Sequence, residues 1–141
     1  MDFRLELVLI PVADVDRAKA FYTERAGFHL DVDTPAGPDM RVVQVTPPGS
    51  ACSVGFGVGL GVTAEPGSVR GLHLVVRDIA AAREELAGRG VEVSEVRHMA
   101  DGAWRAGPHP EHTDYNSFAE FRDPDGSLWL LQEVGHTATA A

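Results

Sequence analysis

One histidine lies where a β-strand could present it to a ligand. His73 stands within residues 70–77, an apolar stretch whose alternation is typical of a half-buried strand. An unperturbed imidazole titrates near neutral pH, so His73 could act as a general acid or base. The alternative is a histidine that hydrogen-bonds within the fold or orients a ligand without reacting. No Ser-His-Asp or Cys-His pairing follows from the spacing, and Cys52 is better interpreted as a small core side chain.

A second group of reactive side chains lies in residues 98–117, which show no helical or strand periodicity. The group consists of His98, Asp101, His109, His112, Asp114 and Tyr115. His109 and His112 with Asp114 could bind a metal ion, but no regular element is predicted to hold them on one face, and a solvated loop is the better interpretation. Long connections in compact domains are often binding loops. We expect Trp104 and Tyr115 to fold over a binding site, and a mobile surface loop is the alternative.

Two similar stretches supply the elements that position these side chains. Asp14, Ala18 and Tyr22 recur at a constant offset as Asp78, Ala82 and Leu86. Each stretch follows an alternating apolar strand, about residues 4–12 and 70–77. Each aspartate is placed to cap a helix N-terminus, and Gly27 and Gly90 fit the left-handed position that ends a helix.

The remainder of each half is predicted to form strands. Their approximate ranges are 28–33, 40–46 and 51–58, then 91–97, 118–122 and 127–134. Each half is then a βαβββ module in one α+β domain over residues 1–135. The first module covers about residues 1–58, the linker 59–69, and the second module about residues 70–135, with a flexible tail at 136–141.

The composition limits the classes of partner. The chain has 141 residues, one cysteine and a net charge of -9, so we expect no disulfide framework and no nucleic-acid partner. No apolar run approaches the length of a membrane span, so we expect no membrane partner. The start Met1-Asp2-Phe3-Arg4 has no apolar signal-peptide region. We therefore expect a cytoplasmic protein with a small-molecule ligand.

Two motifs carry a family resemblance. Residues 12–22 read Val-x-Asp-x-x-x-Ala-x-x-Phe-Tyr, and residues 123–129 read Asp-Pro-Asp-Gly-x-x-Trp. With the tandem modules, the chain resembles the vicinal oxygen chelate superfamily, which contains glyoxalase I, extradiol dioxygenases, fosfomycin-resistance enzymes and bleomycin-binding proteins. It is most similar to small glyoxalase/bleomycin resistance proteins. The resemblance covers about residues 4–134 and implies two βαβββ modules forming a curved mixed sheet around a cleft, usually in a homodimer.

The resemblance also locates the usual metal ligands. In metal-using members these come from the first and last strands of each module, and the positions carried over are Leu7, Ser53, Gly71 and Leu130. Leucine and glycine side chains offer no donor atom, and a neutral serine hydroxyl is a weak ligand. The resemblance therefore implies no metal at the usual site and no cofactor, the alternative being one divalent ion. Glu133 has the wrong strand parity to replace Leu130.

The same positions imply which side chains line the cleft, since alternate residues share a strand face. Leu9 then accompanies Leu7, His73 accompanies Gly71, and Gln132 accompanies Leu130. The expected ligand-binding residues are Leu7, Leu9, Gln44, Ser53, Gly71, His73, Trp104, Tyr115, Leu130 and Gln132. Such an apolar lining with few polar groups is typical of a small-molecule site.

Two functions from different classes follow from the resemblance. The first is binding of a small apolar or aromatic molecule without the usual metal, in the manner of the bleomycin-resistance branch. The second is an enzyme of the lyase, isomerase or dioxygenase type. That enzyme would be metal-free with His73 as acid or base, or would bind a metal through displaced ligands. A homodimer is expected in both cases.

Overall fold

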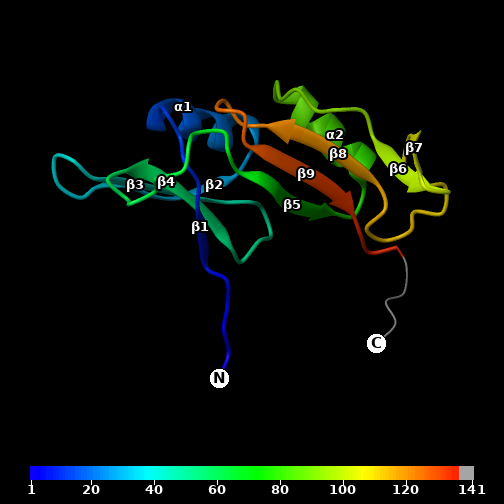
Figure 1. The fold of residues 1–141 in the computed structure, drawn as a ribbon, viewed down its shortest axis with the longest axis horizontal. Helices are drawn as coiled ribbons and strands as arrows, with labels where there is room; N and C mark the ends of the chain where they lie inside the picture. The colour runs from blue at the N-terminus through cyan, green and yellow to red at the C-terminus, as the bar shows by residue number, and fades with distance from the viewer. Residues whose placement is uncertain (137–141) are drawn as a thin grey trace. The chain divides into compact units, whose positions relative to one another are not determined.

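The computed structural model describes residues 1–136, which divide into two compact units (Figure 1). The first unit comprises Met1–Val69 with the turn Asp123–Ser127. The second comprises Arg70–Arg122 with the described residues from Leu128 on. The flexible tail expected at residues 136–141 lies outside the described residues, except for His136.

The first unit has one four-stranded mixed sheet. Its elements are β1 (Leu7–Leu9), α1 (Val15–Ala20), a π-helical segment (Phe21–Arg25), β2 (His29–Pro35), β3 (Arg41–Thr46) and β4 (Ser53–Val58). The strand order is β1-β4-β3-β2, with β1 parallel to β4 and the other pairs antiparallel. The first strand is shorter than the predicted 4–12, because residues 1–6 run away from the sheet as an exposed arm (Figure 1).

The helix of the first unit begins as predicted. The side chain of Asp14 accepts a hydrogen bond of 3.0 Å from the backbone N–H of Arg17, which confirms the N-cap. The helix then widens to a π-helical turn, in which Ala26 N–H donates to the carbonyl of Phe21 at 2.8 Å. Gly27 has a φ of 77° at the end of the helix, as expected for a terminating glycine.

The core of the first unit lies between this helix and one face of the sheet. Tyr22 is fully buried, and its ring contacts those of Phe28 and Phe56 with centroids 5.7 and 5.6 Å apart. Val43 and Val45 of β3 complete this covered face. Alternate strand residues consequently form an open face on the other side of the sheet.

The second unit has a five-stranded mixed sheet. Its elements are β5 (Arg70–Val76), α2 (Ile79–Gly88), β6 (Arg97–Ala100), β7 (Ala103–Ala106), β8 (Phe118–Arg122) and β9 (Leu128–Glu133). The strand order is β5-β9-β8-β6-β7, with β5 parallel to β9. Asp78 caps α2 by accepting from Ala81 N–H at 3.0 Å, and Gly90 has a φ of 90°, so both predictions are confirmed.

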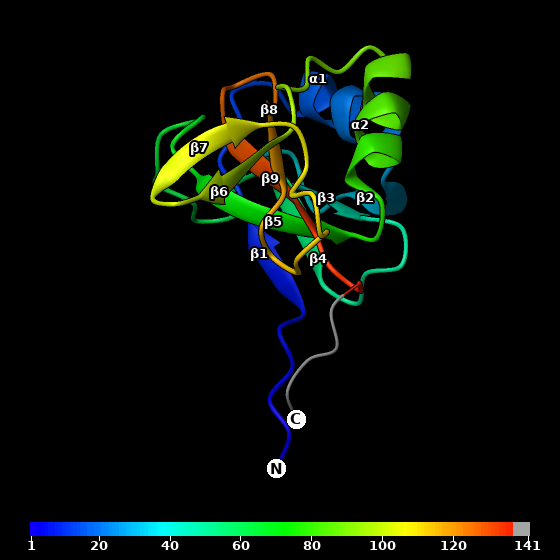
Figure 2. The same cartoon turned by 90° about the vertical axis from the view of Figure 1, so that its right-hand side faces the viewer.

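Helix α2 covers one face of this sheet, where it packs against β8 and β9 (Figure 2). Trp129 and Phe121 stack on that face with ring centroids 6.0 Å apart. Ile79 and Leu131 are buried beside them. The α+β class and the two modules are therefore confirmed.

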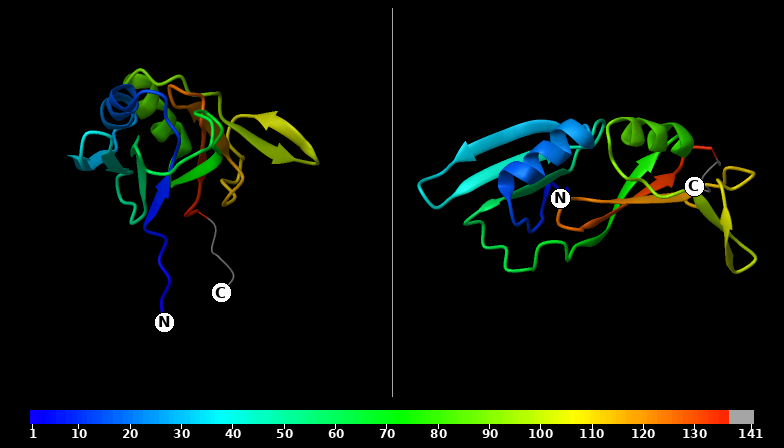
Figure 3. Two further views of the ribbon diagram at one scale, coloured as in Figure 1. Left: turned by 60° about the vertical axis from the view of Figure 1, so that its left-hand side comes forward. Right: turned by 90° about the horizontal axis from the view of Figure 1, so that it is seen from above.

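Two predictions for the second unit are wrong. The strand expected at 91–97 is an irregular segment up to β6, because the Arg83 guanidinium binds the carbonyls of Ser94 and Val93 at 2.7 and 3.3 Å in place of a strand partner. Residues 98–117 are not a structureless loop. They contain most of β6 and all of β7, which form a hairpin that projects from the sheet (Figure 3).

The hairpin turn explains the second error. Asp101 and Gly102 both have positive φ, at 52° and 74°. A two-residue Asp-Gly loop with positive φ at both positions is a preferred connection between antiparallel strands. Trp104 therefore lies on a strand and not on a loop. None of the helices in residues 1–136 has the length and apolar content that a membrane span requires.

Candidate functional site

The open face of the second sheet carries most of the expected ligand-binding residues. Strand register pairs His73 with Leu130 and Val75 with Gln132 across β5 and β9. It continues onto β8, where Phe118 is opposite Gln132. These side chains share the face opposite α2. Gly71 also belongs to β5, with a φ of 91° and open space at the position of a Cβ atom.

His73 and Gln132 form the polar part of this face. Gln132 Nε2 donates to the Tyr115 carbonyl at 3.1 Å, which places the amide oxygen toward the imidazole. His73 Nδ1 lies 3.1 Å from Gln132 Oε1, so we assign the proton of a neutral His73 to Nδ1. No hydrogen-bond partner of His73 Nε2 is found within residues 1–136. This nitrogen can therefore accept a hydrogen bond or a proton.

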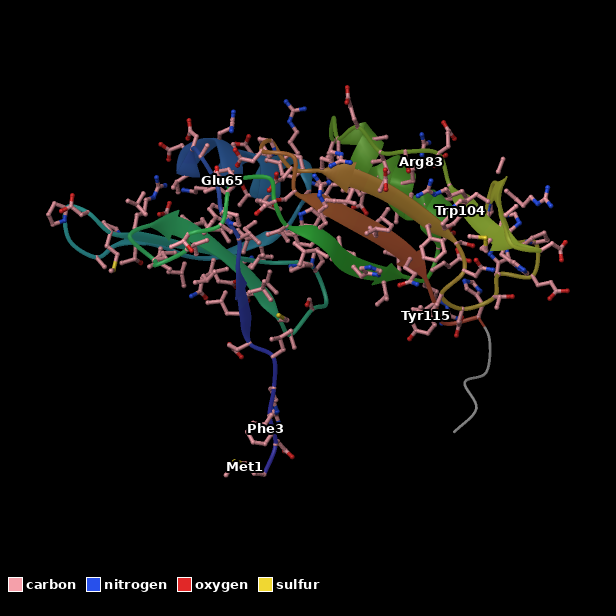
Figure 4. All side chains as sticks on the ribbon, in the orientation of Figure 1. Met1, Phe3, Glu65, Arg83, Trp104 and Tyr115 are labelled. Carbon is pink, nitrogen blue, oxygen red and sulfur yellow. The ribbon has the colours of Figure 1, made fainter. Side chains whose placement is uncertain are left out.

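Aromatic side chains border the polar pair on the hairpin side. Trp104 packs edge-on against Phe118 with centroids 5.4 Å apart, and the Arg97 guanidinium lies 4.3 Å from the Trp104 ring centroid. Arg97 is also 3.9 Å from the Glu120 carboxylate. Figure 4 shows Trp104 on the hairpin and Tyr115 near the end of β9. About half of the Trp104 surface remains exposed, at 48%, so one part of the ring is open to a ligand.

A hollow of about 380 Å³ adjoins this aromatic group. Its volume falls in the range of small-molecule sites. Its lining comes from β6, β7, β8 and the preceding segment: Ser94, Glu95, Val96, Arg97, Trp104, Arg105, Ala106 and Glu120. Arg97, Phe118 and Glu120 were not predicted as site residues. Residues 118–122 were predicted as a strand, but the pairing of this strand with β6 and β9 was not readable from the sequence.

The open face of the first sheet carries the other expected residues. Leu7 is opposite Ser53 and Leu9 is opposite Gly55, where a Cβ atom would lie 3.0 to 3.1 Å from these leucine side chains. Gln44 of β3 is also opposite Gly55. The Ser53 hydroxyl lies 2.6 Å from the hydroxyl of Thr46, so it is already hydrogen-bonded. This face therefore combines the two leucines with the polar side chains of Gln44, Ser53 and Thr46.

The two units thus divide the positions where the resemblance placed metal ligands. Leu7 and Ser53 lie on the first sheet, and Gly71 and Leu130 lie on the second. The residue opposite Leu130 on β5 is His73, and on β8 it is Glu120. The register across β5, β9 and β8 places His73 and Glu120 beside Leu130 and no further carboxylate or imidazole next to them. The residues present do not provide a usual metal-ligand set.

The histidines of residues 98–117 have separate environments. His98 is buried with Nδ1 2.8 Å from the Gly107 carbonyl. His109 packs edge-on against His98, and its Nδ1 accepts from Glu111 N–H at 3.1 Å. His112 instead lies 2.7 Å from Glu133 on the side of the sheet that α2 covers. The His109–His112–Asp114 combination considered from sequence is therefore not assembled as one ligand set.

The most perturbed carboxyl lies away from these residues, beside α1. Two hydrogen bonds from Arg41, at 3.0 and 3.1 Å, and one from Lys19, at 2.7 Å, lower the pKa of Asp33 to about 2. Arg41 also donates to Asp16 at 2.8 Å, and both carboxylates raise the pKa of its guanidinium. This charge network connects α1 with β2 and β3, so its role is in the fold.

The sequence model of the Glyoxalase/Bleomycin resistance protein/Dioxygenase superfamily matches residues 4–131. The chain belongs to this superfamily. TnmS3, an antibiotic binding protein from Streptomyces sp. CB03234, has a crystal structure with a TM-score of 0.73 and 35% identity, covering 95% of this chain and 98% of that one.

Two further relatives of this superfamily protein extend across most of the chain. A glyoxalase/bleomycin resistance protein from Streptomyces sp. CB03234 is 36% identical, with a TM-score of 0.69 and coverage of 92% and 99% of the two chains. The Bacillus subtilis (strain 168) protein YetH is 25% identical over 128 residues, covering 89% of this chain and 94% of that protein. The residues that the superfamily model matches, 4–131, include the two motifs at residues 12–22 and 123–129.

Proposed function

We propose that this superfamily member binds a small, flat aromatic molecule without using the metal positions of the family. The observation that carries the proposal is the open face of the second sheet. Exposed apolar side chains there, Val75 at 57% and Trp104 at 48%, accompany the hydrogen-bonded pair of His73 and Gln132. An exposed aromatic ring on the same face as an oriented imidazole suits a ligand that stacks and makes a directed hydrogen bond.

The polar pair also suggests the chemistry of that hydrogen bond. The Tyr115 carbonyl orients the Gln132 amide, and the amide oxygen holds the proton of His73 on Nδ1. The free Nε2 lone pair then accepts a hydrogen bond, so the ligand should carry a phenol or amide N–H donor. The similarity to TnmS3, an antibiotic binding protein, supports an antibiotic as the ligand class.

A second candidate function is proton transfer by His73. Its unpartnered Nε2 favours this function, because a general base needs an available lone pair directed at the substrate. The group that orients Nδ1 is the neutral amide of Gln132 and not a carboxylate, so a charged imidazolium would gain no ion pair from it. Simple binding is therefore the better-supported function.

We also propose a homodimer. The arm of residues 1–6 exposes Phe3 at 90% together with Met1 and Leu5, which is a large apolar surface for six residues. It continues directly into β1, an edge strand of the first sheet. Edge strands with apolar extensions are surfaces that a second copy can cover. The apolar surface of the arm therefore favours self-association through this segment.

A thermal-shift screen of polycyclic aromatic antibiotics tests the binding function. A ligand present at about 100 times its Kd should stabilise the folded chain by about 2.7 kcal/mol. Molecules with a phenol or amide N–H should stabilise it more than their O-methyl or N-methyl derivatives, because methylation removes the donor for His73 Nε2. Equal stabilisation by both members of each pair, or stabilisation retained in Trp104→Ala, would contradict the proposed site.

A further inference from the structure

Three potential metal ligands converge on the side of the second sheet that α2 covers. Glu133 is the last residue of β9, His136 follows three residues later, and His112 belongs to the connection between β7 and β8. One ligand atom from each lies within 4.8 Å of the other two. The cluster lies on the opposite strand parity from Leu130 and Gln132, so it is distinct from the open face.

Glu133 is the buried member of the cluster and is held in place. Its residue is 1% exposed. Oε2 accepts a hydrogen bond of 3.0 Å from the backbone N–H of Ile79, at the start of α2. Oε1 lies 2.7 Å from His112 Nδ1 and 3.9 Å from His136 Nε2. One carboxylate oxygen therefore anchors the side chain, and the other is directed at both imidazoles.

We propose that His112 Nδ1, Glu133 Oε1 and His136 Nε2 bind one divalent transition-metal ion of the zinc type. Two imidazole nitrogens and a carboxylate oxygen are ligands that zinc prefers, at about 2.0–2.2 Å. Tetrahedral geometry at those lengths separates neighbouring ligand atoms by about 3.3 Å. The observed separations lie on both sides of this value, so small side-chain rotations bring the three atoms to a common ion.

A backbone carbonyl supplies a fourth donor. The Arg77 carbonyl accepts a hydrogen bond from His136 Nε2. When an ion replaces the proton on this nitrogen, the same carbonyl oxygen lies beside the ion and can complete a four-coordinate site. The His136 N–H donates to the Asp114 carboxylate at 2.9 Å, which holds the histidine backbone in place.

The exposure of the cluster gives the ion an access route. The side chains of His112 and His136 are 48% and 33% exposed, whereas that of Glu133 is 2% exposed. An ion can therefore enter from solvent between the two imidazoles and reach the buried carboxylate. Its charge would balance that of the buried Glu133 carboxylate.

The role of the ion would be structural. The four donors come from Arg77 before α2, the connection after β7, the end of β9 and His136. Binding would join these segments in the second unit, and it would stabilise the folded chain because the unfolded chain has no formed site. The open-face residues His73 and Gln132 take no part in it.

Isothermal titration of the full-length, tag-free protein with Zn²⁺ tests the proposal. We expect one ion per chain. The affinity for Zn²⁺ should fall by about 10- to 100-fold in each of His112→Ala and His136→Ala. The matched control is His29→Ala. The side chain of His29 is exposed and lies 3.6 Å from the Asp31 carboxylate. It is not part of the cluster, so its removal should leave the affinity for Zn²⁺ unchanged.

A second measurement keeps the test decisive if a variant is unstable. Zn²⁺ should raise the melting temperature of the wild-type chain and of His29→Ala, and not that of His112→Ala, while Co²⁺ should give the intense visible bands of a four-coordinate site. Glu133→Gln retains an acceptor for Ile79 N–H and should lose the ion. Absence of a one-to-one Zn²⁺ isotherm, or equal affinity in the His29 and His112 variants, would overturn the proposal.

Discussion

The phenol of Tyr22 donates a hydrogen bond of 2.7 Å to Asp123 Oδ2, and both side chains are buried. The two residues belong to the two motifs that carry the family resemblance, 101 positions apart in the chain. Asp123 Oδ1 accepts from the backbone N–H groups of Asp125 and Ser127 at 3.0 and 2.9 Å. Arg17 also donates to Asp125 at 2.8 Å. The Asp-Pro-Asp-Gly motif is therefore a turn, as predicted, and also a partner of the first helix.

Tyr22→Phe should reduce the free energy of unfolding by about 1–3 kcal/mol. The substitution keeps the buried ring but leaves Asp123 Oδ2 without this donor, and an unsatisfied buried acceptor is costly. Urea denaturation measures the change. Ser127→Ala is the control, because Ser127 Oγ is buried without a hydrogen-bond partner among the described residues. Its removal should change stability by less than about 0.5 kcal/mol or increase it. Equal losses in both variants would contradict the assigned role of Tyr22.

Trp104→Ala should weaken ligand binding more than His73→Ala. The first change removes exposed aromatic area, and the second removes one hydrogen bond worth about 0.5–1.5 kcal/mol, or about tenfold in affinity. Calorimetric titration with any ligand from the screen measures both. Trp104→Phe should restore part of the affinity because it keeps a ring against Phe118. Unchanged affinity in Trp104→Ala would remove the aromatic group from the binding site.

The same two variants separate binding from catalysis. If His73 transfers a proton, His73→Ala should lower the rate by about 10²–10⁴-fold with a smaller change in affinity. We expect the loss to appear in affinity, because the Gln132 amide oxygen orients the imidazole through Nδ1 and leaves Nε2 to accept a hydrogen bond from the ligand. A large rate loss at constant affinity would instead establish the enzyme function.

Protonation of Asp33 should make the folded chain less stable in acid. Its pKa is about 2 in the fold against 3.8 for the free group, because of hydrogen bonds from Arg41 and then Lys19. A carboxyl with a lowered folded pKa contributes stability above pH 3.8 and loses it as the pH falls toward 2. Asp33→Asn should therefore cost about 1 kcal/mol near neutral pH, and the cost should shrink as the pH falls through 2. A difference that does not vary between these pH values would exclude Asp33 as its source.

Metal content should not depend on the usual family positions. Ser53 is the only one of Leu7, Ser53, Gly71 and Leu130 with a donor atom in its side chain. Elemental analysis of tag-free Ser53→Ala should match the wild-type chain, whereas Glu133→Gln should contain less bound ion. Loss of an ion in Ser53→Ala would place a metal at the usual site and contradict the metal-free binding proposal.

Light scattering should report a dimer at micromolar concentration. In the double variant Phe3→Ser/Leu5→Ser the measured mass should shift toward that of the monomer, because the exposed arm then loses most of its apolar surface. Thr63→Ser serves as a control, since this exposed residue lies outside the arm. A monomeric mass for the wild-type chain throughout this range would rule out the dimer.

Local signals predicted much of the fold. Asp14 and Asp78 cap helices, and Gly27 and Gly90 end them, because each of these features depends on a few neighbouring residues. The β6–β7 hairpin was missed although Asp101-Gly102 is a strong turn signal, because its short strands show no alternation. The irregular segment before β6 depends on the distant Arg83 side chain, which no local pattern reveals.

The candidate sites were less accessible from sequence. Strand parity separates Leu130 and Gln132 from Glu133, but parity alone does not identify the neighbours of a side chain. The contact of Trp104 with Phe118 depends on how β6, β7 and β8 pair. The cluster at Glu133 depends on the path of residues 107–116 and on the start of α2. These relationships arise from pairing and packing at long range.

The different environments of the two tryptophans give the chain two spectroscopic reporters. Trp129 is buried against Phe121, so its fluorescence should be blue-shifted and should respond to unfolding of the second unit. Trp104 is half exposed on the open face, so its emission should be red-shifted and quenched by a stacked ligand. In Trp104→Phe the remaining emission would report on the core, and the difference from the wild-type spectrum would report on ligand occupancy. One titration could therefore follow occupancy and folding without an added dye.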